Sequence, residues 1–305
     1  MSLCLLCPGQ GSQAPDMFEG MQRDPVLAQA LHTLLRPEQR DLLTIAADDT
    51  RCYLNRHAQP LIVLYGLAVA TALRDAGVKP AVVAGYSIGE LTGHAVASAL
   101  DAPGALQLAH LRAAAMDAAA PPNHGMLAVL GVAWRELEVQ ALAAGAVTAI
   151  RNGADHTVLA GPLKNLQALS QSLVALKGAH VVPLPINVPA HSHWLSAGVP
   201  VFAQALESAV WQPHQAPVIA GLDGSLVDNK SAAVRTLSQQ IAQPIDWARV
   251  LDVAVEMGTR AFFEIGPGNR LSRMVRERHP DFPSRSLDDF ASFSGAVKWL
   301  DRQLR

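Results

Sequence analysis

Residues 85–90 read Gly85-Tyr-Ser-Ile-Gly-Glu90 and stand between two segments of different character. The apolar run 80–84 has the length and composition of a buried strand, whereas 90–100 reads as a helix. Gly-x-Ser-x-Gly between a strand and a helix is the pattern of a nucleophile elbow, in which small neighbours permit a sharp turn that exposes the serine hydroxyl. The stretch predicts an α/β fold in which Ser87 is a nucleophile.

The partners of such a serine are only partly fixed by the sequence. The turn would place Ser87 over a helix N-terminus, where the backbone N–H of Ile88 is a candidate donor to an oxyanion. A nucleophilic serine also needs a base, and the chain has 11 histidines. His191 follows a segment of different texture, where the chain must return to the main sheet. His193 lies close beside it, so residue order alone leaves both histidines open.

The composition narrows the class of protein. With 305 residues, the chain suits one large domain with an insert or two ordinary domains, and its 50% apolar residues allow a large core. A net charge of −2 gives no reason to expect a nucleic acid or an anionic membrane as partner. The longest apolar run, 61–73, is too short to span a bilayer, and no basic segment precedes the apolar N-terminus. A cytoplasmic protein is expected.

The cysteines and histidines predict neither a redox centre nor a metal site. Cys4 and Cys7 have the spacing of a redox motif, but they lie in a strand-like run, where such a pair points to opposite faces. No group of cysteines and histidines has the spacing of zinc ligands. We therefore expect two buried strand cysteines and no bound metal.

The segment 124–189 predicts a separate subdomain. Its pattern gives strands near 125–132, 147–152, 157–160 and 179–188 and helices near 134–144 and 163–176. This β-α-β-β-α-β order is the plan of a ferredoxin-like unit. The prediction is therefore a large domain formed by 1–123 and 190–305, with a ferredoxin-like subdomain at 124–189.

Several motifs together resemble one family over essentially the whole chain. They are, in order, Pro8-Gly-Gln-Gly-Ser-Gln13, Gly85-Tyr-Ser-Ile-Gly-Glu90, Leu111-Arg112, Val188-Pro-Ala-His191, Gln240-Ile-Ala-Gln-Pro-Ile-Asp-Trp247 and Glu264-Ile-Gly-Pro-Gly268. This set resembles the malonyl-CoA:acyl carrier protein transacylase family. The resemblance implies an α/β-hydrolase-like large domain with an inserted ferredoxin-like subdomain. It also implies ping-pong transfer of a malonyl group from malonyl-CoA to the prosthetic-group thiol of an acyl carrier protein, without a cofactor.

The resemblance also implies roles for single residues. Ser87 matches the nucleophile, His191 the general base and Gln240 the residue whose carbonyl orients that histidine. The backbone N–H groups of Gln10 and Ile88 match the oxyanion donors. Arg112 matches the arginine that holds the acyl carboxylate, and Asn152 lies where the small domain reaches toward the site.

Each of these residues also has a plainer interpretation. Gln10 could be a turn residue, as could Gln13, and Arg112 could be an exposed helix arginine. Its surroundings are largely apolar, however, and an unpaired arginine there would be costly, so we expect it to meet an anion. The arginines at 270, 273, 276 and 278 could form a solvated helix face or a surface for an acidic carrier protein.

Two departures from the family pattern indicate a specialised branch. Tyr86 stands where the family commonly has histidine, and Ile88 where it commonly has leucine. In its overall texture, including Cys7-Pro-Gly-Gln-Gly11 and Gly85-Tyr-Ser-Ile-Gly-Glu90, the chain looks most like the transacylase (epsilon) subunit of bacterial malonate decarboxylase. The alternatives are a malonyl transacylase of fatty-acid or polyketide synthesis, a serine thioesterase or hydrolase, and a non-catalytic scaffold subunit. A hydrolase should have an acidic triad member and several strands before its nucleophile, but no acidic residue stands out between Ser87 and His191.

Overall fold

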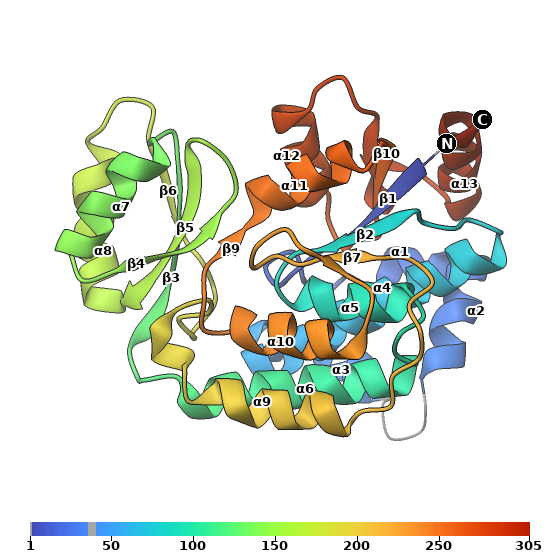
Figure 1. Ribbon diagram of the computed structural model, residues 1–305, viewed down its shortest axis with the longest axis horizontal. Coiled ribbons are helices and arrows are strands. Elements are labelled where there is room, and N and C mark those ends of the chain that lie inside the picture. Colours follow the sequence, from blue (N-terminus) through green and yellow to red (C-terminus); the bar gives the residue numbers. More distant parts are fainter. Residues whose placement is uncertain (1, 36–40) are drawn as a thin grey trace.

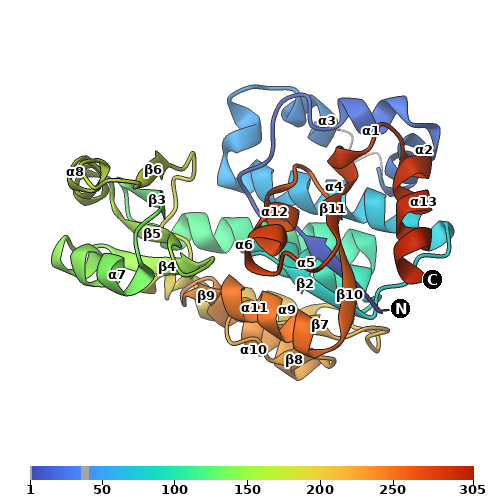
Figure 2. The same ribbon diagram turned by 90° about the horizontal axis from the view of Figure 1, so that it is seen from above.

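The computed structural model describes residues 2–35 and 41–305, which form two units around two β-sheets (Figure 1). The predicted class is confirmed: a large α/β-hydrolase-like unit carries a small ferredoxin-like unit inserted into its chain. Figure 2 shows the small unit, with α7 and α8, at one end of the molecule. Within the described residues no helix is both long and apolar enough to cross a membrane.

The larger sheet positions three chain segments at one edge. In the described residues it has six strands in the order β11-β10-β1-β2-β7-β8, and every neighbouring pair is parallel except β7 with β8. The register pairs Cys7 with Gly85 and Leu6 with Glu264, so the carboxyl ends of β1, β2 and β10 lie together. Open parallel sheets bind their ligands at this edge. The strands are β1 Ser2–Cys7, β2 Val82–Gly85, β7 Val218–Ile219, β8 Leu226–Val227, β10 Thr259–Glu264 and β11 Ser284–Ser286.

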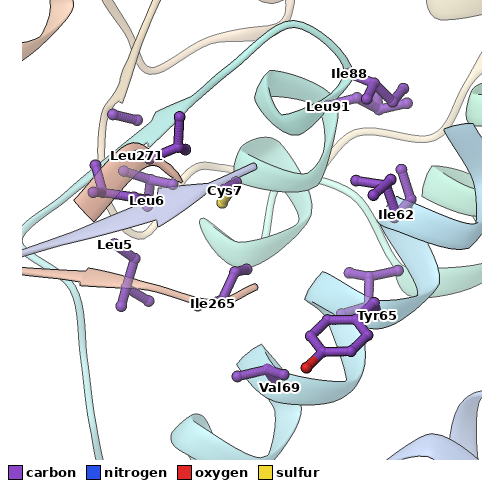
Figure 3. Close-up of a cluster of buried hydrophobic side chains, with 14 of the residues drawn as sticks. Leu5, Leu6, Cys7, Ile62, Tyr65, Val69, Ile88, Leu91, Ile265 and Leu271 are labelled. Carbon is purple, nitrogen blue, oxygen red and sulfur yellow. The ribbon is translucent and has the colours of Figure 1, made fainter. Parts of the chain in front are cut away.

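Helices cover both faces of this sheet, with α4 (Asn55–Asp75) and α5 (Ile88–Val96) on one side and α11 (Trp247–Glu256) and α12 (Arg270–Arg278) on the other (Figure 1). Strands buried on both faces are largely apolar, as residues 3–7 of β1 are. Figure 3 shows the buried core on both sides of β1, with Leu6 close to Leu271 of α12 and with Ile88 and Leu91 of α5 together on the opposite side. The remaining helices are α1 Glu19–Arg23, α2 Pro25–Leu34, α3 Asp41–Ala46, α6 Ala102–Ala119, α9 Gly198–Ser208, α10 Lys230–Gln240, α13 Phe293–Leu304 and the short 3₁₀ helices η2 Arg51–Tyr53, η3 His193–Leu195 and η4 Leu287–Asp289.

The small unit has the element order that its sequence predicts. Its elements are β3 His124–Leu130, α7 Trp134–Ala143, β4 Val147–Arg151, β5 His156–Pro162, α8 Leu163–Val174 and β6 His180–Pro183. Both helices lie on the outer face of its sheet, so the other face looks toward the large unit (Figure 1). Side chains alternate between the two faces of a strand. In β3, Leu127 and Val129 therefore belong to the small unit's own core, whereas Met126 and Ala128 belong to the main core.

A two-residue strand of the large unit extends the small sheet. This strand, β9 (Ile245–Asp246), pairs in parallel with β4 and gives the order β6-β3-β5-β4-β9. Two hydrogen bonds between Arg151 and Asp246 reinforce the contact, and the Arg151 guanidinium lies 5.1 Å from the ring centre of Trp134. The sequence did not predict β9. The predicted limits of the two domains, at 123/124 and 189/190, stay a prediction.

Candidate active site

Ser87 occupies a strained turn between β2 and α5. Its backbone has φ 56° and ψ −119°, a conformation that residues with side chains rarely adopt. A Cβ at Gly85 would lie 2.2 Å from the backbone nitrogen of Glu90, and one at Gly89 would lie 2.1 Å from the carbonyl oxygen of Cys7. A side chain at either position would force the backbone apart, so the local geometry is that of the predicted elbow.

His191, and not His193, meets the serine. The Ser87 Oγ lies 2.8 Å from the Nε2 of His191, while Nδ1 lies 2.6 Å from the backbone carbonyl oxygen of Gln240. A carbonyl only accepts, so Nδ1 carries the proton and Nε2 is left to accept one from the serine. His193 instead lies in η3, with its ring 4.2 Å from that of Trp194.

The imidazole of His191 is poised as a neutral base. Burial, followed by the charge of Arg112, lowers its pKa to about 3, although the hydrogen bond to Gln240 opposes the shift. The histidine side chain is therefore uncharged at pH 7. It can take the proton of the Ser87 hydroxyl as that oxygen attacks an electrophile.

Arg112 reaches the same point from α6. It is only 1% exposed, and its Nη2 donates to the Ser87 Oγ at 3.3 Å. The side-chain oxygens of Gln59 and Gln240 accept from its two Nη atoms at 2.9 and 3.1 Å. Burial lowers the pKa of Arg112 to about 10 against the opposing charge of Glu90, so the guanidinium stays charged at neutral pH. The alternative of an exposed helix arginine is wrong.

Two residues of this cluster, Gln59 and Glu90, were not predicted as site residues from the sequence. Glu90 is fully buried and accepts hydrogen bonds from the Gly221 N–H at 2.8 Å and from the Nε2 of Gln240 at 2.5 Å. Burial raises the pKa of Glu90 to about 7, and these hydrogen bonds and Arg112 oppose the rise. An acidic residue, Glu90, therefore does lie close to the site, but it bonds the side chain of Gln240. The place beside His191 that an acidic triad member would fill is taken by the backbone carbonyl of Gln240.

The predicted oxyanion donors lie on segments packed against each other. Ile88 opens α5, and Gln10 lies in the loop after β1. The loop lies directly against the elbow, because a Cβ at Gly9 would meet the carbonyl oxygen of Tyr86 at 2.5 Å. Backbone N–H groups at a helix N-terminus and an adjoining loop suit a developing oxyanion. Gln13 is a turn residue, since its Oε1 accepts from the Gly11 N–H at 2.6 Å.

A cavity of about 520 Å³ opens over Ser87 between the two units. Asn152 lines it from the small unit, is 5% exposed, and its Nδ2 lies 3.1 Å from His156 Nε2, whereas its Oδ1 has no partner among the described residues. On the opposite wall, α12 contributes Arg270 and Arg273. The cavity therefore has a largely apolar small-unit wall around Asn152, an opposite wall with two arginines and Glu277, and the serine at its base.

Three other predictions from the sequence concern the cysteines, metal binding and the arginines of α12. Cys4 and Cys7 are buried free thiols, and burial raises their pKa values above the usual range, so they are unreactive. Among the described residues, no group of three or more histidine, cysteine or acidic side chains could hold a metal ion. Of the four arginines on α12, Arg276 donates to the Ser284 carbonyl, and Arg278 pairs with Asp252.

Comparisons with known proteins agree with this geometry. The sequence pattern of the family described as "Acyl transferase domain" matches residues 4–281. The malonyl CoA-acyl carrier protein transacylase of Mycobacterium bovis is 30% identical over 291 residues, covering 93% of this chain and 96% of that protein. The Synechocystis protein of the same name is 28% identical, covering 96% and 100%. The crystal structure of an acyl-carrier-protein S-malonyltransferase from Burkholderia pseudomallei superposes with a TM-score of 0.89 at 26% identity, covering 98% and 100%. The chain therefore belongs to the acyl transferase domain family, in the group of the malonyl-CoA:acyl carrier protein transacylases.

Proposed function

We propose that the protein transfers malonyl groups from malonyl-CoA to the thiol of an acyl carrier protein. The observation that carries this proposal is the convergence on one oxygen atom, the Ser87 Oγ, of the His191 Nε2 at 2.8 Å and the Arg112 Nη2 at 3.3 Å. A nucleophile, its base and a buried cation thus share one site. The likeness to transacylases along the whole chain supports the same reaction.

The reaction proceeds in two matched halves. The Ser87 Oγ attacks the thioester carbonyl carbon while its proton passes to the Nε2 of His191, and the N–H groups of Gln10 and Ile88 hold the oxyanion. When the C–S bond breaks, His191 returns the proton to the leaving CoA sulfur, and a malonyl ester remains on Ser87. The carrier thiol then gives its proton to His191 and attacks the ester, and Ser87 recovers its proton as it leaves.

Arg112 supplies the preference for malonyl. Malonyl differs from acetyl by one carboxylate, which a guanidinium can bind through two parallel hydrogen bonds. The Nε of Arg112 is buried and has no hydrogen-bond partner among the described residues, and Nη2 faces the nucleophile. A carboxylate seated there would satisfy the guanidinium and fix the acyl group against Ser87.

The carrier approaches along α12 in this proposal. Arg270 and Arg273 line the cavity wall and make no ion pair with another described residue, whereas Arg276 and Arg278 are engaged elsewhere. Two free cations beside the cavity suit the phosphate of a pantetheine-type arm and an acidic carrier surface. Asn152, on the opposite wall, would bind the arm through its unpartnered Oδ1.

A narrower proposal places the protein in malonate decarboxylase, where the carrier would be a subunit with a CoA-type prosthetic group. Its support is confined to sequence texture, above all Tyr86 and Ile88 in the elbow. The named relatives favour the alternative, a malonyl transacylase that serves acyl carrier proteins generally. Transfer rates to each type of purified carrier would separate the two.

Incubation with labelled malonyl-CoA tests the reaction itself. A transacylase forms a stable malonyl-enzyme that discharges to a carrier thiol, a hydrolase releases free malonate, and a scaffold subunit does neither. Mass spectrometry should locate the malonyl group on Ser87, and Ser87→Ala should abolish the label. A malonyl adduct on another residue, with Ser87 unmodified, would contradict the assignment.

A further inference from the structure

The buried charge of Arg112 is held by neutral groups. Besides the Ser87 hydroxyl, its side-chain acceptors are two amide oxygens, from Gln59 and Gln240. Among the described residues no carboxylate forms a salt bridge with it, although Glu90 lies close enough to raise its pKa. A buried guanidinium usually gains a carboxylate partner. In this protein no described carboxylate takes that place beside Arg112, so the place is open to a ligand.

The amide of Gln240 has only one orientation that satisfies both of its neighbours. The two ends of a glutamine amide are nearly identical in shape but opposite in hydrogen-bonding sense. Arg112 can only donate, so it requires the oxygen, and ionised Glu90 can only accept, so it requires the nitrogen. The distances of 3.1 Å from Oε1 to Arg112 and 2.5 Å from Nε2 to Glu90 show both requirements met.

A similar arrangement stands on the other side of the guanidinium. Gln59 turns its oxygen to Arg112 and its Nε2 to the Asn55 Oδ1 at 2.7 Å. The Nδ2 of Asn55 donates in turn to Asp117 at 2.8 Å. On both sides, then, an acidic residue stands behind an amide, and no acidic residue touches the arginine directly.

We propose that Glu90 is a positioning residue, which turns the Gln240 amide oxygen toward Arg112 and so keeps the guanidinium supported but free to bind the carboxylate of the substrate. The inference rests on the proposed function, because it concerns how the site selects malonyl. If a carboxylate contacted Arg112 directly, the malonyl group would have to displace it. If Glu90 were absent, the Gln240 amide could turn its nitrogen toward Arg112. Two hydrogen-bond donors would then face each other, and the guanidinium would lose that acceptor.

The test compares kcat/KM for malonyl-CoA with that for acetyl-CoA, at a pH above 7 where Glu90 is ionised. Glu90→Met removes the acceptor, and the malonyl-to-acetyl ratio should fall about tenfold or more, the loss typical of one charge-assisted hydrogen bond. Glu90→Gln restores an acceptor oxygen and should recover most of the ratio. A purely structural role would lower both rates together, and the ratio does not depend on the fraction of protein that is folded.

Two further variants make the result decisive. Glu264→Met is a matched control at the same cavity, because Glu264 is also fully buried but accepts from two backbone N–H groups, those of Leu271 and Ser272, and not from Gln240. Its ratio should equal that of the wild type. Gln240→Glu, combined with Glu90→Gln so that no second carboxylate lies beside it, keeps the size and backbone of residue 240 but puts a carboxylate against Arg112, so the ratio of this double variant should fall about tenfold or more.

The outcomes separate the two proposals. If wild-type protein forms no malonyl-Ser87, the proposed function fails. If the wild type forms it but Glu90→Met and the double variant Glu90→Gln/Gln240→Glu keep the wild-type ratio, the role of Glu90 is refuted. Should Glu90→Met not fold, an unchanged ratio in the double variant refutes the inference by itself.

Discussion

Replacing Gly89 by alanine should impair acylation far more than folding. Gly89 lies in the first turn of α5, where the helix passes the end of β1. An added Cβ would stand 2.1 Å from the carbonyl oxygen of Cys7 and 2.6 Å from that of Pro8. Both obstacles are backbone atoms of the strand end that leads into the Gln10 loop, so the helix and the loop have to move apart.

The size of this movement follows from the contact distance. Real Cβ contacts essentially never fall below 3.0 Å, so relief from 2.1 Å requires a shift of about 0.9 Å. Misplacement of catalytic groups by ~1 Å costs on the order of a hundredfold in rate. Overpacking a core costs about 1–3 kcal/mol, less than the stability of about 5–15 kcal/mol of a typical domain. We expect Gly89→Ala to fold and to acylate roughly a hundredfold more slowly.

Gly93→Ala is the control on the same helix. Its Cβ would meet only side-chain methyl groups, of Val83 at 3.2 Å and Val218 at 3.5 Å, which can adjust. Rapid-quench measurement of malonyl-enzyme formation, with thermal unfolding of each variant, makes the comparison. Wild-type acylation by Gly89→Ala would show that the spacing between elbow and Gln10 loop is not needed, and would refute the reasoning.

Further predictions concern the base and the cation. His191→Ala should lower transfer by several orders of magnitude and His193→Ala should leave it nearly intact, and the reverse order in steady-state assays would move the base to His193. Arg112→Ala should lower the malonyl-to-acetyl ratio of kcat/KM about ten- to a hundredfold, and Arg112→Lys should recover only part of it, whereas a constant ratio would make the arginine structural. Because the pKa of His191 is lowered, its neutral form persists as the pH falls through 6.5 and is lost toward pH 3. The rate of acylation by acetyl-CoA should therefore persist as the pH falls through 6.5 and be lost toward pH 3. A pH–rate profile with an acid limb at 6.5 would contradict this.

The sequence predicted most of the longer elements of the fold, although not α13, and it missed three short strands. Runs such as β1 and the β-α-β-β-α-β insert have periodicities that reveal them. Strands β8 and β9 have two residues each and β11 has three, too few for any period to be visible. They form because a neighbouring edge offers hydrogen-bond partners, and that edge exists only after folding.

The residues of the candidate site could likewise be predicted only in part. Ser87 and Ile88 follow from a local strand-turn-helix pattern, whereas Arg112 and Gln240 were identified only through family resemblance. Gln59 was missed, although it and Asn55 are polar residues in the otherwise apolar buried surface of α4. What joins it to Arg112 is a contact between α4 and α6, and no local sequence pattern records such a contact.

The strand β9 links the opening of the cleft to the alignment of the catalytic base. Ile245 pairs with Ile150 of the small sheet, and a short connection joins it to Gln240, whose carbonyl orients His191. The Arg151–Asp246 ion pair makes this attachment firm. A tilt of the small unit would be transmitted through β9 to the segment that carries Gln240 and orients the imidazole. The position of the small unit over the cavity and the alignment of the base thus share one connection.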